Sequence, residues 1–551
     1  MIKMKSIAQF TSYGTALALV ISALCYTFYN ASSFPYWDMW DGNVSFLGQF
    51  KRTHDIGLLF QQHNDHRILI TRILFMIDEY IFGGNYFSLY IVNILCALAF
   101  VLLLWKVIVK IVGFREHQIM LVLLAGISFS LIQKENFAWA FQSQFFLAYL
   151  LPFAAYYFWA KHLEDNRPLW LTIAIIFLAL SMFSMSNGIF ATIPMIALEL
   201  FHRRRWRIVL MLTLLQIIFF ILFFYNYHMA SDSGNLSTML ARPFLALNYI
   251  LTYLGSWTGS SFAAVVGAIE VFYIGVVLIK IANGRYKPNW EAALILFTLF
   301  VFMTAVLTMI GRINFGITSA MASRYATPTL YAALCTFALM YLNNKRLRTP
   351  SLVFLGLLAL GMSVNNLYEV RNIFVSNDEF ERRVSTISVL QGTPDAPLFN
   401  SKSYPWNLQT DTIKLAREQR VGMFGKEPYL NMANLLNTDI EFELPQQQCV
   451  GHIDEISTIQ GTETTKITGW IEVESLLTRY NLLTIVNGQK LVGFGKNGSY
   501  RSDLKQKLGL KRSTSGFIVY TPNFTKTDVP AYILVGYPNT RCYLPIKLAL
   551  K

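Results

Sequence analysis

Long apolar runs recur through the first two thirds of the chain. We expect eleven of them to be helical spans, because about 20 consecutive apolar residues cross the hydrocarbon core of a bilayer. The runs cover residues 7–29, 86–111, 119–133, 145–160, 169–186, 188–201, 208–229, 263–281, 290–310, 327–343 and 351–368. The pattern therefore predicts a polytopic α-helical membrane protein with about 11 transmembrane helices.

The stretch between the seventh and eighth runs breaks this pattern. Residues 230–262 contain the string LNYILTYLGSWTGSSF, which is only moderately apolar and rich in Gly and Ser. Irregular backbone at membrane depth is tolerated only where protein or a water-filled cavity satisfies its polar groups. We therefore expect a surface or re-entrant segment here. The first run follows MIKMKS and lacks a small-residue cleavage site, so we expect it to be a retained anchor.

The first loop, about residues 30–85, contains an amphipathic pattern. In HRILITRILFMIDEYIF, apolar residues recur at helical spacing at Leu69, Ile73, Met76, Ile77 and Tyr80. This periodicity predicts an amphipathic helix. Such a helix suits the outer membrane surface, and the alternative of a helix packed over the bundle is compatible with that position.

The long apolar runs end near residue 370, which divides the chain into a transmembrane domain (1–370) and a tail. The tail is expected to comprise a mixed linker region (371–445) and a β-module (446–551). The module contains the strand-like strings KITGWIEV, LLTIVNGQKLVGF with an Asn487-Gly488 hairpin turn, GFIVYT and YILVGY. They predict a small β-sandwich. Cys449 and Cys542 bracket the module and should pair in an oxidising compartment; the alternative is two unpaired buried thiols.

Composition and charge agree with a membrane protein and indicate its orientation. Hydrophobic residues make up 54% of the chain and charged residues only 14%. The net charge of +14 at pH 7 could indicate a nucleic-acid partner, but the excess lies in short loops between apolar runs. Lys and Arg in such loops favour the cytoplasmic side. We therefore expect no nucleic-acid partner, a cytoplasmic N-terminus, and a first loop and tail that face outward.

The outward polar residues beside the spans are the candidate site. Asp38 and Asp41 lie among four aromatic residues in FPYWDMWDG, where Trp37 and Trp40 are expected to anchor the loop at headgroup depth, with stacking on a sugar as the alternative. The other candidates are His63, Asp65, His66 and Arg67 in QQHNDHR, Glu135 and Asn136 in QKENFAWAFQSQF, and Arg312, Arg324 and Tyr325 in GRINFGITSAMASRYATP. Each of these residues, taken alone, could simply belong to a turn, cap a helix or lie at the membrane interface. Because all of them are predicted on the outer side of the membrane, a functional role is favoured.

Acids and arginines at an outer membrane surface suit the transfer of a group from an anionic lipid. A carboxylate can take the proton from an acceptor hydroxyl, and Arg can neutralise the phosphate that is left behind. His63 and His66 form an H-x-x-H pair that could ligate a metal with a carboxylate. The sequence fixes no third ligand, so we expect no metal or other cofactor and interpret the histidines as hydrogen-bond donors to phosphate or sugar.

The order of these features across residues 1–370 resembles the GT-C class of integral-membrane glycosyltransferases, which use a polyprenyl-phosphate sugar as donor. A first span precedes a long outer loop that opens with an acid (YWDMWDG) and contains a surface helix; a second acid follows in KEN, and basic residues follow in GRINFG and SRY. HNDHR, QKENFAWAFQ and SRYATP are also similar to strings in uncharacterised bacterial membrane proteins of this kind. The resemblance implies that Asp38 or Asp41 is the base, without deciding between them, and that Glu135 is the second acid.

The resemblance implies a hexosyltransferase that moves one sugar from a polyprenyl-phosphate donor to a cell-envelope glycan, such as the O-antigen of lipopolysaccharide, by an inverting displacement. The WWDYG signature of oligosaccharyltransferases is absent. We expect a multi-pass protein of the bacterial inner membrane with a periplasmic C-terminal domain, although N-x-S/T sites such as that at Asn497 leave a eukaryotic secretory membrane open.

Two other classes remain open at this point. An O-antigen polymerase or ligase would share the outer Arg residues and the lipid-linked donor, but it would rely on a large late outer loop. A non-enzymatic glycan transporter would need ionisable groups in mid-span. Glu270 is the acid that lies deep in an expected span.

Reporter fusions test the predicted orientation. Fusions after Arg207 and Arg348 should give a cytoplasmic signal, because these residues end inner loops rich in Lys and Arg, and a fusion after Asn400 should report the outer side. A cytoplasmic signal from the Asn400 fusion would contradict the whole topology.

Overall fold

The computed structural model describes residues 2–113, 117–203, 205–228, 236–405, 407–440, 444–472, 481–504, 514–522, 530–536 and 540–546. The chain divides into two compact units. Unit 1 comprises Met1–Ala31, Ile56–Leu74 and Phe87–Val370, and unit 2 comprises Ser32–Asp55, Phe75–Tyr86 and Arg371–Lys551. The first loop therefore contributes residues to both units. The domain boundaries expected at residues 370 and 445 remain a prediction.

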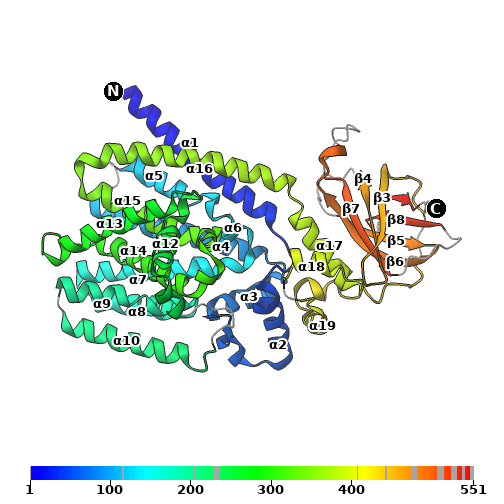
Figure 1. Cartoon of the computed structure of the whole chain (residues 1–551), viewed down its shortest axis with the longest axis horizontal. Coiled ribbons are helices and arrows are strands. Elements are labelled where there is room, and N and C mark those ends of the chain that lie inside the picture. The colour runs from blue at the N-terminus through cyan, green and yellow to red at the C-terminus, as the bar shows by residue number, and fades with distance from the viewer. Residues whose placement is uncertain are drawn as a thin grey trace. The chain divides into compact units, whose positions relative to one another are not determined.

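Unit 1 is mainly helical in its described part (Figure 1), apart from the two-residue strands β1 (Gln62–His63) and β2 (His66–Arg67). Its helices are α1 (Ile2–Asn30), α4 (Phe87–Val112), α5 (Gln118–Ile127), α6 (Lys134–Ala138), α7 (Ser143–Asp165), α8 (Pro168–Met182), α9 (Ile193–Leu198), α10 (Trp206–Phe224), α11 (Leu236–Ala241), α12 (Pro243–Leu254), α13 (Ala263–Ala282), α14 (Glu291–Arg312), α15 (Ala326–Asn343) and α16 (Arg348–Val375), whose last five residues belong to unit 2. Short 3-10 and π-helical turns connect them.

An aromatic cluster at the centre of unit 1 joins four of these helices. The ring of Phe100 in α4 stacks on Tyr331 of α15 at a centroid distance of 3.9 Å and on Phe153 of α7 at 4.5 Å. Phe297 of α14 lies 5.2 Å from the same ring. All four side chains are almost fully buried. Aromatic contacts of this kind stabilise a core beyond the area that they bury, so Phe100 fixes α4 against α7, α14 and α15.

The structure confirms a polytopic helical membrane protein. Among the described residues, eight helical segments are long and apolar enough to cross a membrane. Three of the eleven expected spans are not among them. Helix α8 has 15 residues, a length of about 22 Å that is shorter than the hydrocarbon core. Residues 188–201 divide into short helical pieces, and residues 145–160 lie in α7, which is less apolar and contains Pro152.

The segment between α10 and α13 contains no long apolar helix in its described part. Helix α12, Pro243–Leu254, has 12 residues and is followed by the turn η7 (Ser256–Thr258). It is counted with the shorter apolar helices, together with α8. The prediction that residues 230–262 do not form a full span is consistent with this arrangement for residues 236–262.

The amphipathic helix predicted in the first loop is α3, Leu69–Phe82. Its apolar residues Ile73, Ile77 and Tyr80 are exposed, whereas Arg72 and Asp78 are buried. This is the reverse of the pattern on a water-facing helix. The exposed apolar face agrees with a helix that lies against lipid.

Unit 2 contains a helical part built from both ends of the chain. It comprises η1, a π-helical turn (Trp40–Ser45), α2 (Phe46–Thr53), α17 (Asp378–Leu390), α18 (Ala396–Lys402), α19 (Thr410–Glu418) and η12 (Gly422–Gly425). Trp40 is fully buried between Phe399 and Phe424, and its indole N–H donates to Ser403 Oγ at 3.2 Å. The prediction that Trp40 anchors the loop at headgroup depth or stacks on a sugar is therefore wrong, because the ring fills the core of unit 2.

The C-terminal β-module is confirmed, and its described strands form one sheet. The strands are β3 (Gly451–Thr458), β4 (Thr464–Ile471), β5 (Leu482–Asn487), β6 (Lys490–Ser499), β7 (Gly516–Pro522), β8 (Ala531–Val535) and β9 (Cys542–Pro545). Their order is β3-β4-β7-β6-β5-β8-β9, and all neighbours are antiparallel. The module is thus a half-barrel of one sheet and not the two stacked sheets of a sandwich.

Two local predictions for this module are confirmed. Asn487 pairs with Lys490 across a hairpin, and Gly488 in the turn has φ 63°, which Gly adopts without strain. Cys449 and Cys542 form a disulfide. The backbone N–H of Cys449 also donates to the carbonyl of Tyr543 in β9, so the segment before β3 is fastened to the opposite edge of the sheet.

Candidate active site

An ion pair joins two of the predicted site residues in unit 1. Glu135 lies in α6, and Arg324 lies in the turn η10 (Ser323–Tyr325). Arg324 Nη1 donates to Glu135 Oε1 at 2.8 Å, and the backbone N–H of Arg324 lies 3.3 Å from Oε2. Both side chains are about 30% exposed (28% and 31%). Glu135, interpreted from the sequence as the second acid, is thus ion-paired with Arg324.

Asn136, the neighbour of Glu135, is part of the framework of this pair. It is fully buried, and its side-chain amide donates to the carbonyl of Arg324 at 2.9 Å and to Thr327 Oγ1 at 2.6 Å. Thr327 in turn donates to Gln133 Oε1. These bonds join α6 to the start of α15. Asn136 therefore positions the ion pair, whereas its predicted contact with substrate stays a prediction.

The two histidines of the first loop are neutral at ordinary pH. The strands β1 (Gln62–His63) and β2 (His66–Arg67) pair as a hairpin. Burial and the nearby charge of Arg72 lower the pKa of His63 to about 3. Burial lowers the pKa of His66 to about 4, against the opposing charge of Asp65 and with a further lowering by Arg312. A neutral imidazole can donate one hydrogen bond to a phosphate, but it offers no positive charge.

Each histidine has a defined neighbour. The backbone N–H of Ser186 lies 3.3 Å from His66 Nδ1, and the Ser186 hydroxyl lies 2.9 Å from the same atom. Nδ1 therefore accepts, which leaves the proton on Nε2. The His63 ring packs edge-on against Phe141 at 5.4 Å. The hairpin is thus placed between the turn at Ser186 and the segment that follows α6.

Arg67 and Asp65 fasten the hairpin to the end of α10. Arg67 donates to the carbonyls of Phe60 (2.6 Å), Phe223 (2.9 Å) and Tyr225. The hydroxyl of Tyr227 donates to Asp65 at 3.2 Å. The described bonds of Arg67 are thus to backbone carbonyls, which is a structural use of the guanidinium. Its predicted contact with the donor stays a prediction.

Arg312 and Tyr325 occupy different environments. Arg312 ends α14, and its charge reaches His66, whose pKa it helps to lower. Among the described residues, no carboxylate lies within ion-pairing distance of Arg312, in contrast to Arg324. Tyr325 is buried, with its ring 5.2 Å from Tyr253 and 6.4 Å from Phe145. Arg312 could therefore pair with an anionic ligand without first losing a carboxylate partner.

The two acids of FPYWDMWDG belong to unit 2. Asp38 is half-buried and Asp41 is exposed. The hydroxyl of Tyr404 donates to Asp41 Oδ2. Burial, that hydrogen bond and the charge of Asp38 together raise the pKa of Tyr404. Both carboxylates thus lie within electrostatic reach of one phenol, which keeps its proton and orients Asp41.

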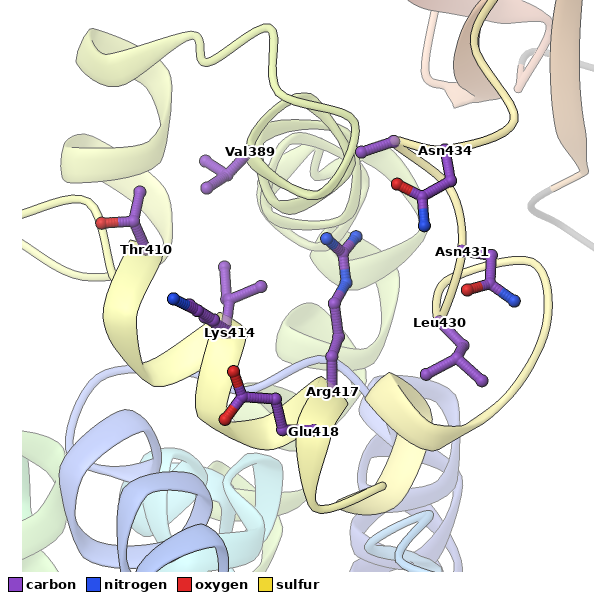
Figure 2. Close-up of a pocket in the computed structure, with 10 residues that line it drawn as sticks. Val389, Thr410, Lys414, Arg417, Glu418, Leu430, Asn431 and Asn434 are labelled. Carbon is purple, nitrogen blue, oxygen red and sulfur yellow. The ribbon is translucent and has the colours of Figure 1, made fainter. Parts of the chain in front are cut away.

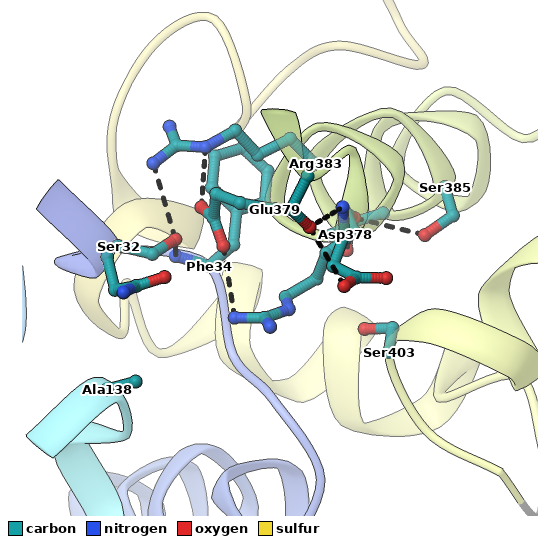
Figure 3. Close-up of polar contacts among 12 residues, drawn as sticks. Ser32, Phe34, Ala138, Asp378, Glu379, Arg383, Ser385 and Ser403 are labelled. Carbon is teal, nitrogen blue, oxygen red and sulfur yellow. Dashed lines mark hydrogen bonds and ion pairs between the residues drawn. The ribbon is translucent and has the colours of Figure 1, made fainter. Parts of the chain in front are cut away.

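The segment that precedes these acids is held by helix α17 (Figure 3). Glu379 accepts from Arg383 Nε at 2.6 Å and from Arg382 at 3.0 Å. The guanidinium of Arg383 lies over the Phe34 ring at 5.1 Å, and that of Arg382 lies over the Tyr36 ring at 4.0 Å. Cation–π contacts of this kind are worth about 0.5–2 kcal/mol each. Residues 34–36 are therefore fixed immediately before Asp38.

Unit 2 also contains a hollow of about 360 Å³ (Figure 2). Helix α19 forms one side of it through Thr410, Ile413, Lys414, Arg417 and Glu418. The remaining lining residues are Val389, Leu430, Asn431, Ala433 and Asn434. None of the site residues predicted from the sequence lines this hollow. Arg417 donates to the carbonyls of Leu390 and Tyr429, so it supports the wall structurally.

Sequence reasoning missed the partners of the predicted residues. Tyr404 lies 363 positions from Asp41, and Ser186 lies 120 positions from His66. No spacing in the sequence indicates such contacts. Gln142 and Gln144 belong to the string QKENFAWAFQSQF, but only Glu135 and Asn136 were selected from it. Among the described residues, no group of three His, Cys, Asp or Glu side chains is placed to hold a metal; the expectation about cofactors stays untested.

The chain was compared with known proteins. Residues 71–227 match the model of a family described as dolichyl-phosphate-mannose-protein mannosyltransferase. This is a glycosyltransferase family of the GT-C fold, so the resemblance to the GT-C class is confirmed. No curated protein matches the chain. The match and the eight apolar helical segments together indicate a multi-pass membrane glycosyltransferase.

The Glu135–Arg324 pair can be tested by a double-mutant cycle. Glu135→Gln and Arg324→Gln should each lower thermal stability and sugar transfer, because each leaves a partner without its counter-charge. The double variant should lose less stability than the sum of the two single variants, with a coupling of about 1–3 kcal/mol.

Lys134 and Glu369, 2.8 Å apart and partly exposed, provide the matched control. Their cycle should give less than about 1 kcal/mol and normal transfer. Equal coupling in both cycles would contradict a special role.

The lowered pKa of His63 predicts a pH dependence of stability. In the unfolded chain His63 is protonated below about pH 6.5, whereas in the folded chain it stays neutral down to about pH 3. Protonation therefore favours the unfolded state as the pH falls below 6.5, and stability should drop by about 2 kcal/mol between pH 8 and pH 5 from this group alone.

The measurement is thermal unfolding of the purified protein at both pH values. His63→Gln should show a smaller difference than the wild type, because it removes the titrating group. His452→Gln, at an exposed position, should keep the wild-type difference. An unchanged pH dependence in His63→Gln would show that His63 titrates normally.

Proposed function

We propose that this protein is a membrane glycosyltransferase that moves one sugar from a polyprenyl-phosphate donor to a cell-envelope glycan, such as O-antigen. The observation that carries the proposal is the match of residues 71–227 to a family described as using a dolichyl-phosphate sugar. The eight apolar helical segments support it, since a polyprenyl donor resides in a membrane. The bacterial inner membrane, with the site on its outer face, is the proposed location.

The donor phosphate is assigned to the arginines of unit 1. Arg312 lacks an ion-pairing carboxylate among the described residues, so a phosphate would be its counter-charge. Arg324 is already paired with Glu135 at 2.8 Å. A phosphate that approaches this pair would compete with Glu135 for the guanidinium. His66 can add a neutral Nε2–H donor, and Asp65 and Tyr227 hold its loop in place.

The acid that activates the acceptor is assigned to unit 2. In an inverting displacement a base takes the proton of the acceptor hydroxyl while the phosphate leaves from the opposite face of the anomeric carbon. Asp38 or Asp41 serves as that base. The bond from Tyr404 to Asp41 orients one carboxylate. This bond does not decide between Asp38 and Asp41 as the base.

Separate substitution of the two acids tests the assignment. Asp38→Asn and Asp41→Asn keep size and most hydrogen bonding but remove the basic oxygen. The variant that lacks the base should lose roughly 10²–10⁴-fold in sugar transfer from a polyprenyl-phosphate donor, while membrane insertion and thermal stability stay near those of the wild type.

Asp55→Asn is the matched control, because Asp55 is an exposed acid of the same loop segment. It should transfer at the wild-type rate. Tyr404→Phe should lower the rate by a smaller factor if Asp41 is the base, since it removes an orienting bond and no proton acceptor. Near-normal transfer by both Asp38→Asn and Asp41→Asn would exclude these acids as the base.

A further inference from the structure

Gln142 and the first turn of α7 contain buried polar side chains whose polar atoms lack hydrogen-bond partners among the described residues. The amide of Gln142 is fully buried, and neither its Nε2 nor its Oε1 has a partner among the described residues. The same holds for Ser143 Oγ and for Gln144 Oε1, in side chains that are 0% and 4% exposed. Buried polar groups in proteins are almost always hydrogen-bonded. Three consecutive exceptions indicate that an outside group completes them.

This segment lies between residues already placed at the candidate site. Phe141, directly before Gln142, packs against His63 at 5.4 Å. Phe145, directly after Gln144, lies 6.4 Å from Tyr325. Glu135 and its bond to Arg324 lie on the preceding helix α6. Residues 142–144 are therefore bracketed by the histidine hairpin on one side and by the late arginine turn on the other.

The chemistry of the unpartnered atoms narrows the class of ligand. Two of them, Gln142 Oε1 and Gln144 Oε1, are acceptors only, Gln142 Nε2 is a donor only, and Ser143 Oγ is both. A phosphate offers acceptors, so it would leave the two amide oxygens without partners. Sugar hydroxyls donate and accept through the same oxygen. Of the phosphate and the sugar of the proposed donor, therefore, only the sugar can satisfy all three side chains together.

We propose that Gln142, Ser143 and Gln144 form the subsite that binds the hydroxyl groups of the donor sugar. The inference rests on the proposed function and deepens it by separating two parts of donor recognition. The arginines recognise the phosphate by charge, and the neutral side chains of residues 142–144 recognise the sugar by hydrogen bonds. A site built to bond a hydroxyl discriminates strongly, because a ligand that lacks it leaves buried polar groups unpaired.

Gln142→Met tests the proposal, because Met has a similar shape and no hydrogen-bonding amide. The full-length protein is purified, and EDTA is present so that a cation cannot bridge the amide oxygens. Equilibrium binding is measured with three probes: polyprenyl-phosphate mannose, polyprenyl-phosphate glucose and polyprenyl phosphate without sugar. Wild-type protein should bind one sugar-linked probe more tightly than the sugar-free lipid. Gln142→Met should bind that probe roughly tenfold or more weakly and the sugar-free lipid unchanged.

Thermal stability without ligand separates a binding role from a structural one. Removal of a buried polar group that has no partner is neutral or stabilising, so Gln142→Met should unfold at the wild-type temperature or above it. Gln216→Met is the matched control. Gln216 is also buried, but it accepts from Thr192 and donates to the carbonyl of Ile189 at 2.7 Å. It should lose stability and keep the affinity for all three probes. Gln144→Met repeats the test at a second position.

Several results would overturn the proposal. Unchanged binding of the sugar-linked probe by Gln142→Met and Gln144→Met would show that the segment does not contact the sugar. An equal loss for the sugar-free lipid would place the phosphate or the lipid there. A fall in stability like that of Gln216→Met would show that the amide has a structural partner. If the wild type binds none of the three probes, the proposed function itself fails.

Discussion

The cost of leaving a polar group unpaired in an apolar surrounding governs the structure of unit 1. An uncompensated charge in such a place costs several kcal/mol, and the described contacts show how this is avoided. Arg72 is buried and donates to the carbonyls of Leu58 and Gln61. Arg67 donates to the end of α10, and Glu135 pairs with Arg324. These contacts join segments distant in sequence, so the bonds that satisfy charge also build the site.

The same constraint limits what the site residues can do. Arg67 and Asn136 are occupied by the framework, and His63 and His66 carry no charge at neutral pH because burial lowers the pKa of each. Among the described contacts of the predicted arginines, Arg324 pairs with Glu135 and Arg67 donates to backbone carbonyls, whereas the guanidinium of Arg312 has neither kind of partner. An anionic donor would therefore find one available guanidinium and one already compensated by Glu135. Recognition of phosphate by few charges leaves most of the donor to be recognised by neutral groups.

Hydrophobic periodicity was enough to predict the membrane class, helix α3 and the β-module, because each depends on residues close in sequence. It failed where the structure depends on the exact length of a helix or on contacts with residues distant in sequence. Helix α8 has 15 residues and is too short to be counted as a span. Trp40 was expected at the membrane surface, yet it fills a core that Phe399 and Phe424 complete from the other end of the chain. Site residues could be selected by type, but their contacts, such as that of Tyr404 with Asp41, depend on tertiary structure.

The unpartnered side chains at the start of α7 are informative because they are consecutive: Gln142, Ser143 and Gln144 each have a buried polar atom without a partner among the described residues. Gln133, nine positions before Gln142 and equally buried, donates to the carbonyl of Ser128 and accepts from Thr327. Two buried glutamines of one short segment thus differ only in whether protein groups complete them. Packing alone does not explain why the second is left incomplete, since an apolar residue of the same shape would cost less there. A ligand with hydroxyl groups does explain it. On this view charge selects the lipid phosphate, and residues 142–144 select the sugar.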